Sequence, residues 1–165
     1  MADATAKDRI LPALLDRLTD DDPGQGEARR DRAFSLRDYR RSILRDLTWL
    51  LNSNAPPAHD ALREYPVVAR SVLNFGMCEL AGMTASALTP AELEKLVREA
   101  IRAFEPRVIP SSLSVRAVEP PGEPAGNVIH LEIRGEVWAE PIPEALYLKT
   151  EIDLESGHCN LKEHG

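Results

Sequence analysis

The residues best suited to chemistry in this sequence stand at a junction, Glu105-Pro106-Arg107 in the stretch AFEPRVIP. A carboxylate can transfer a proton, and a guanidinium can bind an anion through its forked donors. Glu105 ends a helical pattern and precedes a proline, which favours extended geometry at that residue. In an extended segment the side chains of Glu105 and Arg107 point to the same side. The sequence therefore predicts a carboxylate and a guanidinium displayed together on a stiffened corner.

Two interpretations of this corner remain open from the residues alone. One is a helix stop with a surface ion pair, which would contribute about 0–1 kcal/mol to stability. The other is a preorganised polar clamp, formed by Glu105, Pro106 and Arg107, that contacts a partner protein. Catalysis at Glu105 is the weaker interpretation, because no second convergent group can be named.

Metal and cofactor sites find little support. The C-terminal stretch SGHCNLKEHG offers His158, Cys159 and His164, but their spacing is loose and a solvated tail over residues 158–165 is expected instead. The nine glycines are scattered and form no phosphate-binding loop. We expect no metal and no cofactor.

Hydrolytic catalysis is not indicated either. A glycosidase needs two carboxylates flanking a cleft, and among 27 acidic residues only Glu79 stands inside an apolar run, where an outward position is expected. His59 and His130 occupy a proline-rich loop and an exposed strand face, so neither suits a nucleophile's base. We predict no catalytic residue, with a peptidoglycan-cleaving glycosidase as the alternative function.

Bulk composition sets the class of protein. The 165 residues carry a net charge of −7, which argues against general nucleic-acid binding. Cys78 and Cys159 are far apart and form no disulfide framework. No signal peptide or membrane-spanning run is apparent. We expect a cytoplasmic protein without direct membrane insertion.

The N-terminal region divides into an arm and a linker. Residues 1–20 contain an amphipathic helical pattern whose apolar side includes Leu14, Leu15 and Leu18. Residues 21–34 are polar and rich in Gly and Pro signals, which is typical of a flexible linker. The arm could fold back onto the body or dock into another protein's groove, and the composition favours neither.

Two helices are expected in the body. Ser35 can cap the first, on which Arg37, Arg41 and Arg45 recur every four residues. That basic stripe is a candidate docking face for an acidic partner, or a solvated face paired with nearby aspartates. The second helix begins with Thr89, Pro90 and Glu92, a capping box with proline at its first position, and ends near Phe104.

Strand patterns follow the second helix. SLSVRAV, VIHLEIRGEVW and LYLKTEIDL each alternate apolar and polar residues. The sequence therefore predicts an α+β fold, with N-terminal helices followed by a largely antiparallel sheet of about three or more strands packed on helices. The expected body spans residues 35–157.

The order of three segments resembles a known family. YRRSILRDLTWLLNS, YPVVARSVLNFGMCELAG and LVREAIRAFEPRVIPSSLSV occur in the order and approximate spacing of the lysozyme-like baseplate wedge proteins of contractile phage tails. Within that family the chain most resembles the TssE subunits of type VI secretion baseplates, whose opening is similar to ILPALLDRL here. The resemblance covers about residues 10–155.

The resemblance implies a structural role rather than an enzymatic one. Such proteins join wedge subunits to the contractile sheath and support assembly of the sheath and tube. The expected partners are TssF, TssG and TssK, the sheath proteins TssB and TssC, and the spike or hub protein. The expected location is a cytoplasmic baseplate docked at the inner membrane through other proteins. The family's Glu-Pro-Arg corner contacts the helical bundle of the wedge core, which the resemblance transfers to Glu105, Pro106 and Arg107.

Overall fold

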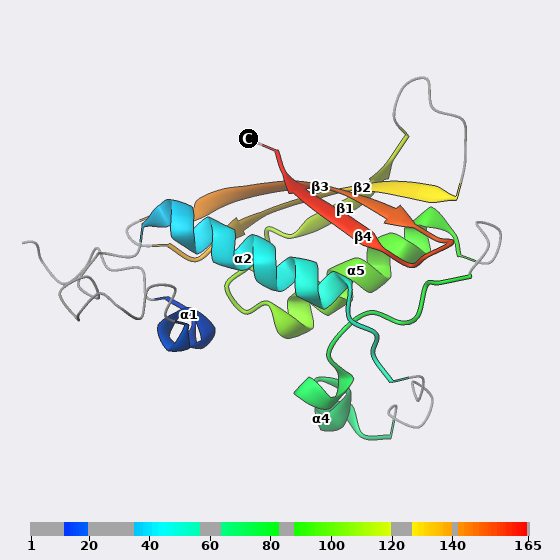
Figure 1. Ribbon diagram of the computed structural model, residues 1–165, viewed down its shortest axis with the longest axis horizontal. Coiled ribbons are helices and arrows are strands. Elements are labelled where there is room, and N and C mark those ends of the chain that lie inside the picture. Colours follow the sequence, from blue (N-terminus) through cyan, green and yellow to red (C-terminus); the bar gives the residue numbers. More distant parts are fainter. Residues whose placement is uncertain are drawn as a thin grey trace, which may run out of the picture.

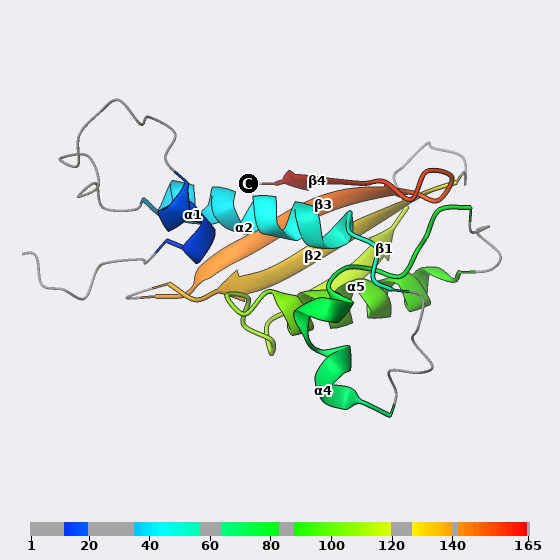
Figure 2. The ribbon, with the colours of Figure 1, turned by 60° about the horizontal axis from the view of Figure 1, so that its bottom comes forward.

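Two helices pack on one face of an antiparallel sheet in the computed structural model of the chain (Figures 1 and 2). The structure describes residues 12–19, 35–56, 64–82, 88–119, 127–139 and 142–164. The predicted linker, the part of the arm before residue 12 and His59 lie outside these ranges. Along the described chain the order is helices first and then strands, so the predicted α+β class is confirmed.

The long helices begin where the sequence predicted. α2 spans Leu36–Leu51, and the Ser35 side chain accepts a hydrogen bond from the Asp38 amide. α5 spans Pro90–Phe104. Its capping box is complete, because the Thr89 side chain accepts from the Glu92 amide and the Glu92 side chain accepts from the Thr89 amide.

Shorter helices flank them. α1 (Leu14–Leu18) belongs to the N-terminal arm. α4 (Pro66–Ala69) and the 3₁₀ helix η2 (Val72–Asn74) lie in the region between α2 and α5. The apolar runs of that region are too short for their periodicity to distinguish helix from strand.

The sheet has the order β1-β2-β3-β4, and every neighbouring pair is antiparallel. Its strands are β1 (Ser114–Val118), β2 (Val128–Val137), β3 (Glu144–Asp153) and β4 (Cys159–Glu163). The inward positions of all four strands pack with α2 and α5 into one core, whose fully buried side chains include Ile43, Leu93, Ile101, Ile133 and Leu148.

β4 corrects one expectation. Residues 158–165 were expected to form a solvated tail, but Cys159 and Leu161 are buried and residues 159–163 pair with β3. Asn52, which follows α2, supports this strand: its Oδ1 accepts from the Cys159 amide and its Nδ2 donates to the Cys159 carbonyl, both at 2.9 Å. A strand of five residues with so few apolar positions cannot be separated from a tail without those distant partners.

Membrane insertion by a helix was not expected. Within the part of the chain that the structure describes, no helix is both long and apolar enough to cross a bilayer.

Candidate functional site

The corner begins where α5 ends. Glu105 is the C-cap, with φ −116° and ψ 85°, and its amide donates to the Ile101 carbonyl at 2.9 Å. This non-helical geometry is what a residue before proline adopts, because the proline ring disfavours the helical region. Pro106 then directs the chain away from the helix axis, so the predicted break at this point is confirmed.

Glu105 and Arg107 form a forked ion pair. The Arg107 Nε donates to Glu105 Oε1 at 2.7 Å, and the Arg107 Nη2 donates to Oε2. The Arg107 backbone amide also donates to Oε1 at 3.0 Å. Only 4% of the Glu105 residue is exposed. Its carboxylate is therefore held as a buried ion-pair partner with both oxygens engaged.

The same guanidinium is bonded to α2. Arg107 Nη1 donates to Ser42 Oγ at 3.0 Å, and Nη2 contacts Asp46 Oδ2 at 2.6 Å. Burial alone would lower the pKa of Arg107, but the hydrogen bonds and charge of Glu105 and then Asp46 raise it well above its ordinary value. Arg107 thus stays charged and joins the end of α5 to the middle of α2.

The corner is also joined to the sheet. The Arg107 carbonyl accepts from the Trp138 amide at 2.8 Å, and the Ile109 amide donates to the Glu136 carbonyl at 2.8 Å. The Tyr39 hydroxyl of α2 donates to the Trp138 carbonyl at 2.6 Å. Residues 107–109 therefore run alongside the end of β2, and both long helices and the sheet meet at this point.

These contacts correct the picture of a displayed pair. Glu105 and Arg107 do lie side by side as predicted, but they face inward onto α2, and the surface ion-pair interpretation is wrong because Glu105 is buried. Pro106 is the exposed member of the three. Contact of this corner with a partner remains a prediction, and it would proceed through Pro106 and the surface beside it.

An apolar groove of about 360 Å³ lies next to the corner. Trp49 and Leu50 of α2, Phe75, Phe104 and Pro106 supply its apolar walls. Trp49 is half-exposed, and the Arg45 guanidinium lies 5.3 Å from the centre of its ring. The groove gives the rigid corner an apolar surface that could be buried by another protein.

The basic stripe on α2 is not uniform. Arg37 is exposed, and Arg41 pairs at 3.6 Å with Asp38 one turn away. Arg45 contacts Asp46 and also Asp16 of the arm. Arg37 and Arg41 thus remain accessible for the predicted partner binding, whereas Arg45 is engaged within the chain.

The arm packs with its polar side inward. Asp16 Oδ1 contacts Arg45 Nη1 at 2.5 Å, whereas no residue of α1 is buried. The leucines nominated for partner binding are the exposed side: Leu14 is 69% and Leu18 is 74% accessible, and Leu15 is also exposed. The described part of the arm therefore folds back, but it does so by a polar contact that leaves its apolar side uncovered.

The weaker candidates do not assemble into a site. Cys159 is buried against the Thr150 hydroxyl, and burial raises the pKa of its thiol. His164 packs edge-on against Tyr147. Within the described ranges no three metal-binding side chains gather together. Glu79 is exposed, as expected of an outward position.

Sequence reasoning missed the α2 residues of the corner. Tyr39, Ser42 and Asp46 recur at spacings of three and four, so they share one side of α2. Ser42 is buried and donates to the Tyr39 carbonyl at 2.9 Å. A serine and an aspartate one turn apart beside an apolar stripe were the available signal for a buried polar partner.

Comparison with known proteins gives one match. The family described as baseplate wedge protein gp25 matches residues 37–142, which include all but the first residue of α2, together with α5, the corner, β1 and β2. No curated protein and no solved structure matches the chain.

Proposed function

Because the chain belongs to the baseplate wedge protein gp25 family, we propose that it is a structural baseplate subunit of a type VI secretion system that joins wedge subunits to the contractile sheath. The role as a structural baseplate protein follows from membership of this family. The finer proposal names TssF, TssG and TssK as wedge neighbours and TssB and TssC as the sheath proteins, on the cytoplasmic side of the inner membrane.

The corner supports the wedge contact. A recognition surface gains affinity when it is ordered before binding, because less conformational entropy is lost on association. Arg107 fixes the corner through Glu105, Ser42 and Asp46, and the groove beside it presents Trp49. We propose that a helix of the wedge core lies in this groove against Pro106.

The sheet edges support the sheath contact. β1 and β4 are the edges. On β1 the Glu94 carboxylate accepts from the Ala117 amide at 2.8 Å, and on β4 Asn52 bonds both backbone groups of Cys159. Strand alternation places the backbone groups of Leu161 and Glu163 on the same outward side as those of Cys159. We propose that a sheath strand adds to β4 beyond Asn52.

A structural role also agrees with the hydrogen bonds of the buried Glu105 carboxylate. Both oxygens of Glu105 accept hydrogen bonds from Arg107, which leaves no oxygen poised to donate a proton to a sugar. Release of soluble fragments from peptidoglycan by the purified chain, with loss of that release in a carboxylate variant, would contradict the structural role.

Two exposed apolar side chains offer a matched test of the wedge contact. Trp49 lines the groove, whereas Val128 is exposed at the start of β2, at the opposite end of that strand from the corner. Trp49→Glu is expected to reduce co-purification with TssF and TssG about tenfold or more, because it places a charge in an apolar contact. Val128→Glu is the control and should bind as the unaltered chain does. Equal binding by both variants would remove the groove from the interface.

A further inference from the structure

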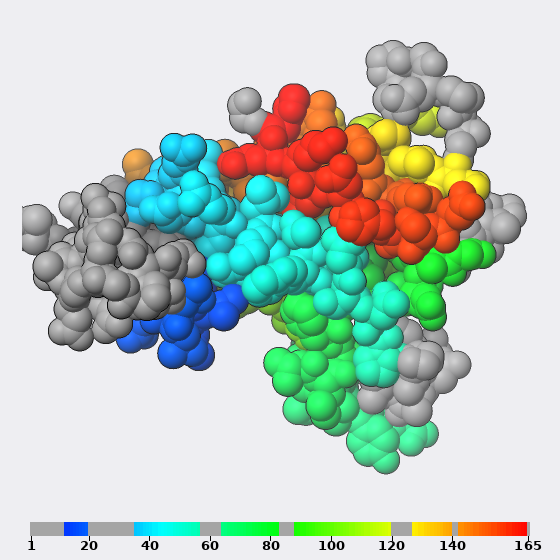
Figure 3. Space-filling model, viewed as in Figure 1, coloured from blue at the N-terminus to red at the C-terminus, as the bar shows by residue number. Residues whose placement is uncertain are grey.

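A second exposed surface lies on the projection that contains α4 and η2 (Figures 1 and 3). Val67 is 82%, Val72 is 83% and Leu73 is 71% accessible, and Tyr65 is also exposed. Neither α4 nor η2 contains a buried residue. Four large apolar side chains within nine residues form an apolar tip, and such clusters mark contact surfaces on soluble proteins.

The base of this projection is fixed. Phe75 packs edge-on against Phe104 with ring centres 5.4 Å apart, and the Met77 amide donates to the Ser53 carbonyl at 2.8 Å. Gly76 has φ +120°, and a Cβ there would lie 2.3 Å from the Ser53 carbonyl oxygen. Only glycine suits that approach. The chain therefore holds the apolar tip at a defined place while leaving it uncovered.

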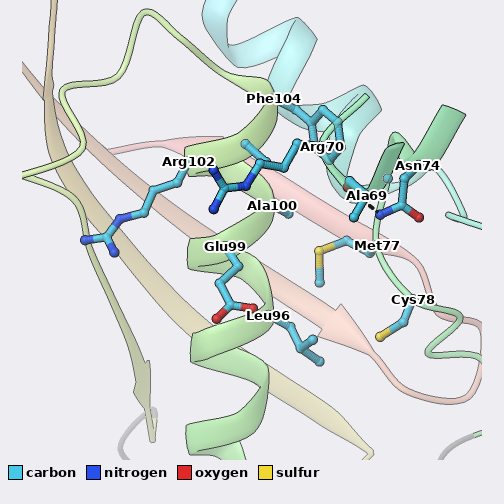
Figure 4. Close-up of a pocket in the computed structure, with 12 residues that line it drawn as sticks. Ala69, Arg70, Asn74, Met77, Cys78, Leu96, Glu99, Ala100, Arg102 and Phe104 are labelled. Atoms are coloured by element: carbon cyan, nitrogen blue, oxygen red, sulfur yellow. Dashed lines mark hydrogen bonds between the residues drawn. The ribbon is translucent and has the colours of Figure 1, made fainter. Parts of the chain in front are cut away.

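A hollow of about 670 Å³ separates the projection from α5 (Figure 4). Leu96, Ala100 and Phe104 of α5 line one side, and Met77 and Cys78 line the other. Its volume lies in the range of about 300–1,000 Å³ that is typical of binding sites. The hollow and the apolar tip adjoin, so one partner segment could cover both.

The polar groups of the hollow indicate the character of that segment. The Arg70 side chain makes no hydrogen bond or ion pair with any described residue. Glu99 lies further along α5 in Figure 4, and its contact with Lys95 is a loose one at 3.9 Å. Arg102 also lines the hollow, but it donates to the Pro110 carbonyl at 3.1 Å and points away.

Asn74 adds a hydrogen-bonding site. Its Nδ2 donates to the Ala69 carbonyl at 2.9 Å, whereas its buried Oδ1 has no partner among the described residues. Buried acceptors are nearly always satisfied in folded proteins. A segment in the hollow could supply the missing donor.

We propose that the hollow and the apolar tip dock a segment of a different protein that carries apolar side chains between an acidic and a basic group. The apolar side chains cover Val72, Leu73 and Leu96, the acidic group pairs with Arg70, and the basic group pairs with Glu99. Paired charges of opposite sign favour a peptide over a uniformly charged ligand. This inference rests on the proposed function only in expecting another baseplate subunit as the source.

Photocrosslinking in living cells that assemble the type VI secretion system tests whether another protein docks at the hollow and the apolar tip. p-Benzoylphenylalanine at Leu73 should crosslink to a peptide of another protein whose apolar residues are flanked by opposite charges. The same probe at Lys149, exposed on the outer face of the sheet, is the control and should not reach that peptide. Crosslinks from Leu73 only to this chain, only to a second copy, or to nothing would overturn the proposal.

Charge variants sharpen the test. Arg70→Glu should reduce the Leu73 crosslink about tenfold, because it repels the acidic group. Arg116→Glu, at an exposed arginine of β1, should leave the crosslink unchanged. An unchanged yield in Arg70→Glu would contradict the assigned charge pairing. If Trp49→Glu prevents baseplate incorporation while Leu73 never crosslinks to another protein, the inference fails and the proposed function stands.

Discussion

Two segments are held against α2 by a carboxylate–guanidinium pair, and they differ in what else holds them. At the corner, Arg107 bonds Glu105, Ser42 and Asp46, and the backbone pairs with β2. In the arm, Asp16 contacts Arg45, and the leucines of α1 stay exposed. Arg45 also contacts Asp46, so the second pair adjoins the network of the first, but it is the more exposed of the two.

The two carboxylate–guanidinium pairs have different effects on stability because they differ in burial. Burying an ion pair costs the hydration of both charges, so the pair stabilises a fold only when its other donors and acceptors are also hydrogen-bonded. Removing one partner alone is strongly unfavourable, because the other charge is then left buried without compensation. A surface pair contributes about 0–1 kcal/mol and can break without unfolding anything. The corner is therefore a fixed structural joint, whereas the arm can leave α2 at little cost.

The largest effect is expected from Glu105→Ala. The change leaves the mostly buried Arg107 charge with Asp46 as its remaining charged partner, and we expect the free energy of unfolding to fall by about 1–3 kcal/mol. Urea denaturation followed by tryptophan fluorescence measures it. Glu99→Ala, at an exposed glutamate of the same helix, is the control and should change stability by less than about 0.5 kcal/mol.

A double variant separates the charge from its packing. Glu105→Leu with Arg107→Leu removes both charges, and we expect it to recover most of the stability that Glu105→Ala loses. A double variant as unstable as Glu105→Ala would contradict the idea that the Arg107 charge left without Glu105 accounts for the loss.

The sequence could predict the local part of this corner but not its orientation. Capping by Ser35, the Thr89–Glu92 box and the break at Pro106 depend on neighbours within four residues, so their patterns are readable. The inward turn of Arg107 depends on Asp46 and Ser42, which precede it by 61 and 65 residues. No periodicity in the sequence encodes which helix surface a side chain will meet.

The packing of β4 and of the arm likewise depends on contacts that are distant in the sequence, so local patterns could not predict it. The strand at Cys159 depends on Asn52, 107 residues earlier, and on pairing with β3. Periodicity predicted an amphipathic arm, and the general rule would bury its leucines. The structure instead buries most of the Asp16 side chain, because Arg45 provides the contact.

An intermediate effect is expected from Asp16→Asn. Losing the pair with Arg45 should change the free energy of unfolding by less than about 1 kcal/mol, yet release the arm from α2. Hydrogen exchange at residues 14–18 and the rate of trypsin cleavage after Arg17 should both rise. Glu151→Gln, which removes a surface pair with Lys162 on the sheet, is the control and should leave both unchanged. Slow cleavage in Asp16→Asn would mean that other contacts hold the arm.

The smallest effect on the isolated chain is expected from Leu14→Ser combined with Leu18→Ser. Because both side chains are already mostly exposed, we expect the free energy of unfolding to change by less than about 0.5 kcal/mol. Leu47→Ala in the core of α2 should lower it by about 2–5 kcal/mol in the same urea assay. If the double serine variant destabilises the chain as strongly, the leucines pack against the body in solution. If it leaves stability intact and weakens co-purification with wedge subunits, the exposed side of α1 is a contact surface, and the arm differs from the corner in function as well as in packing.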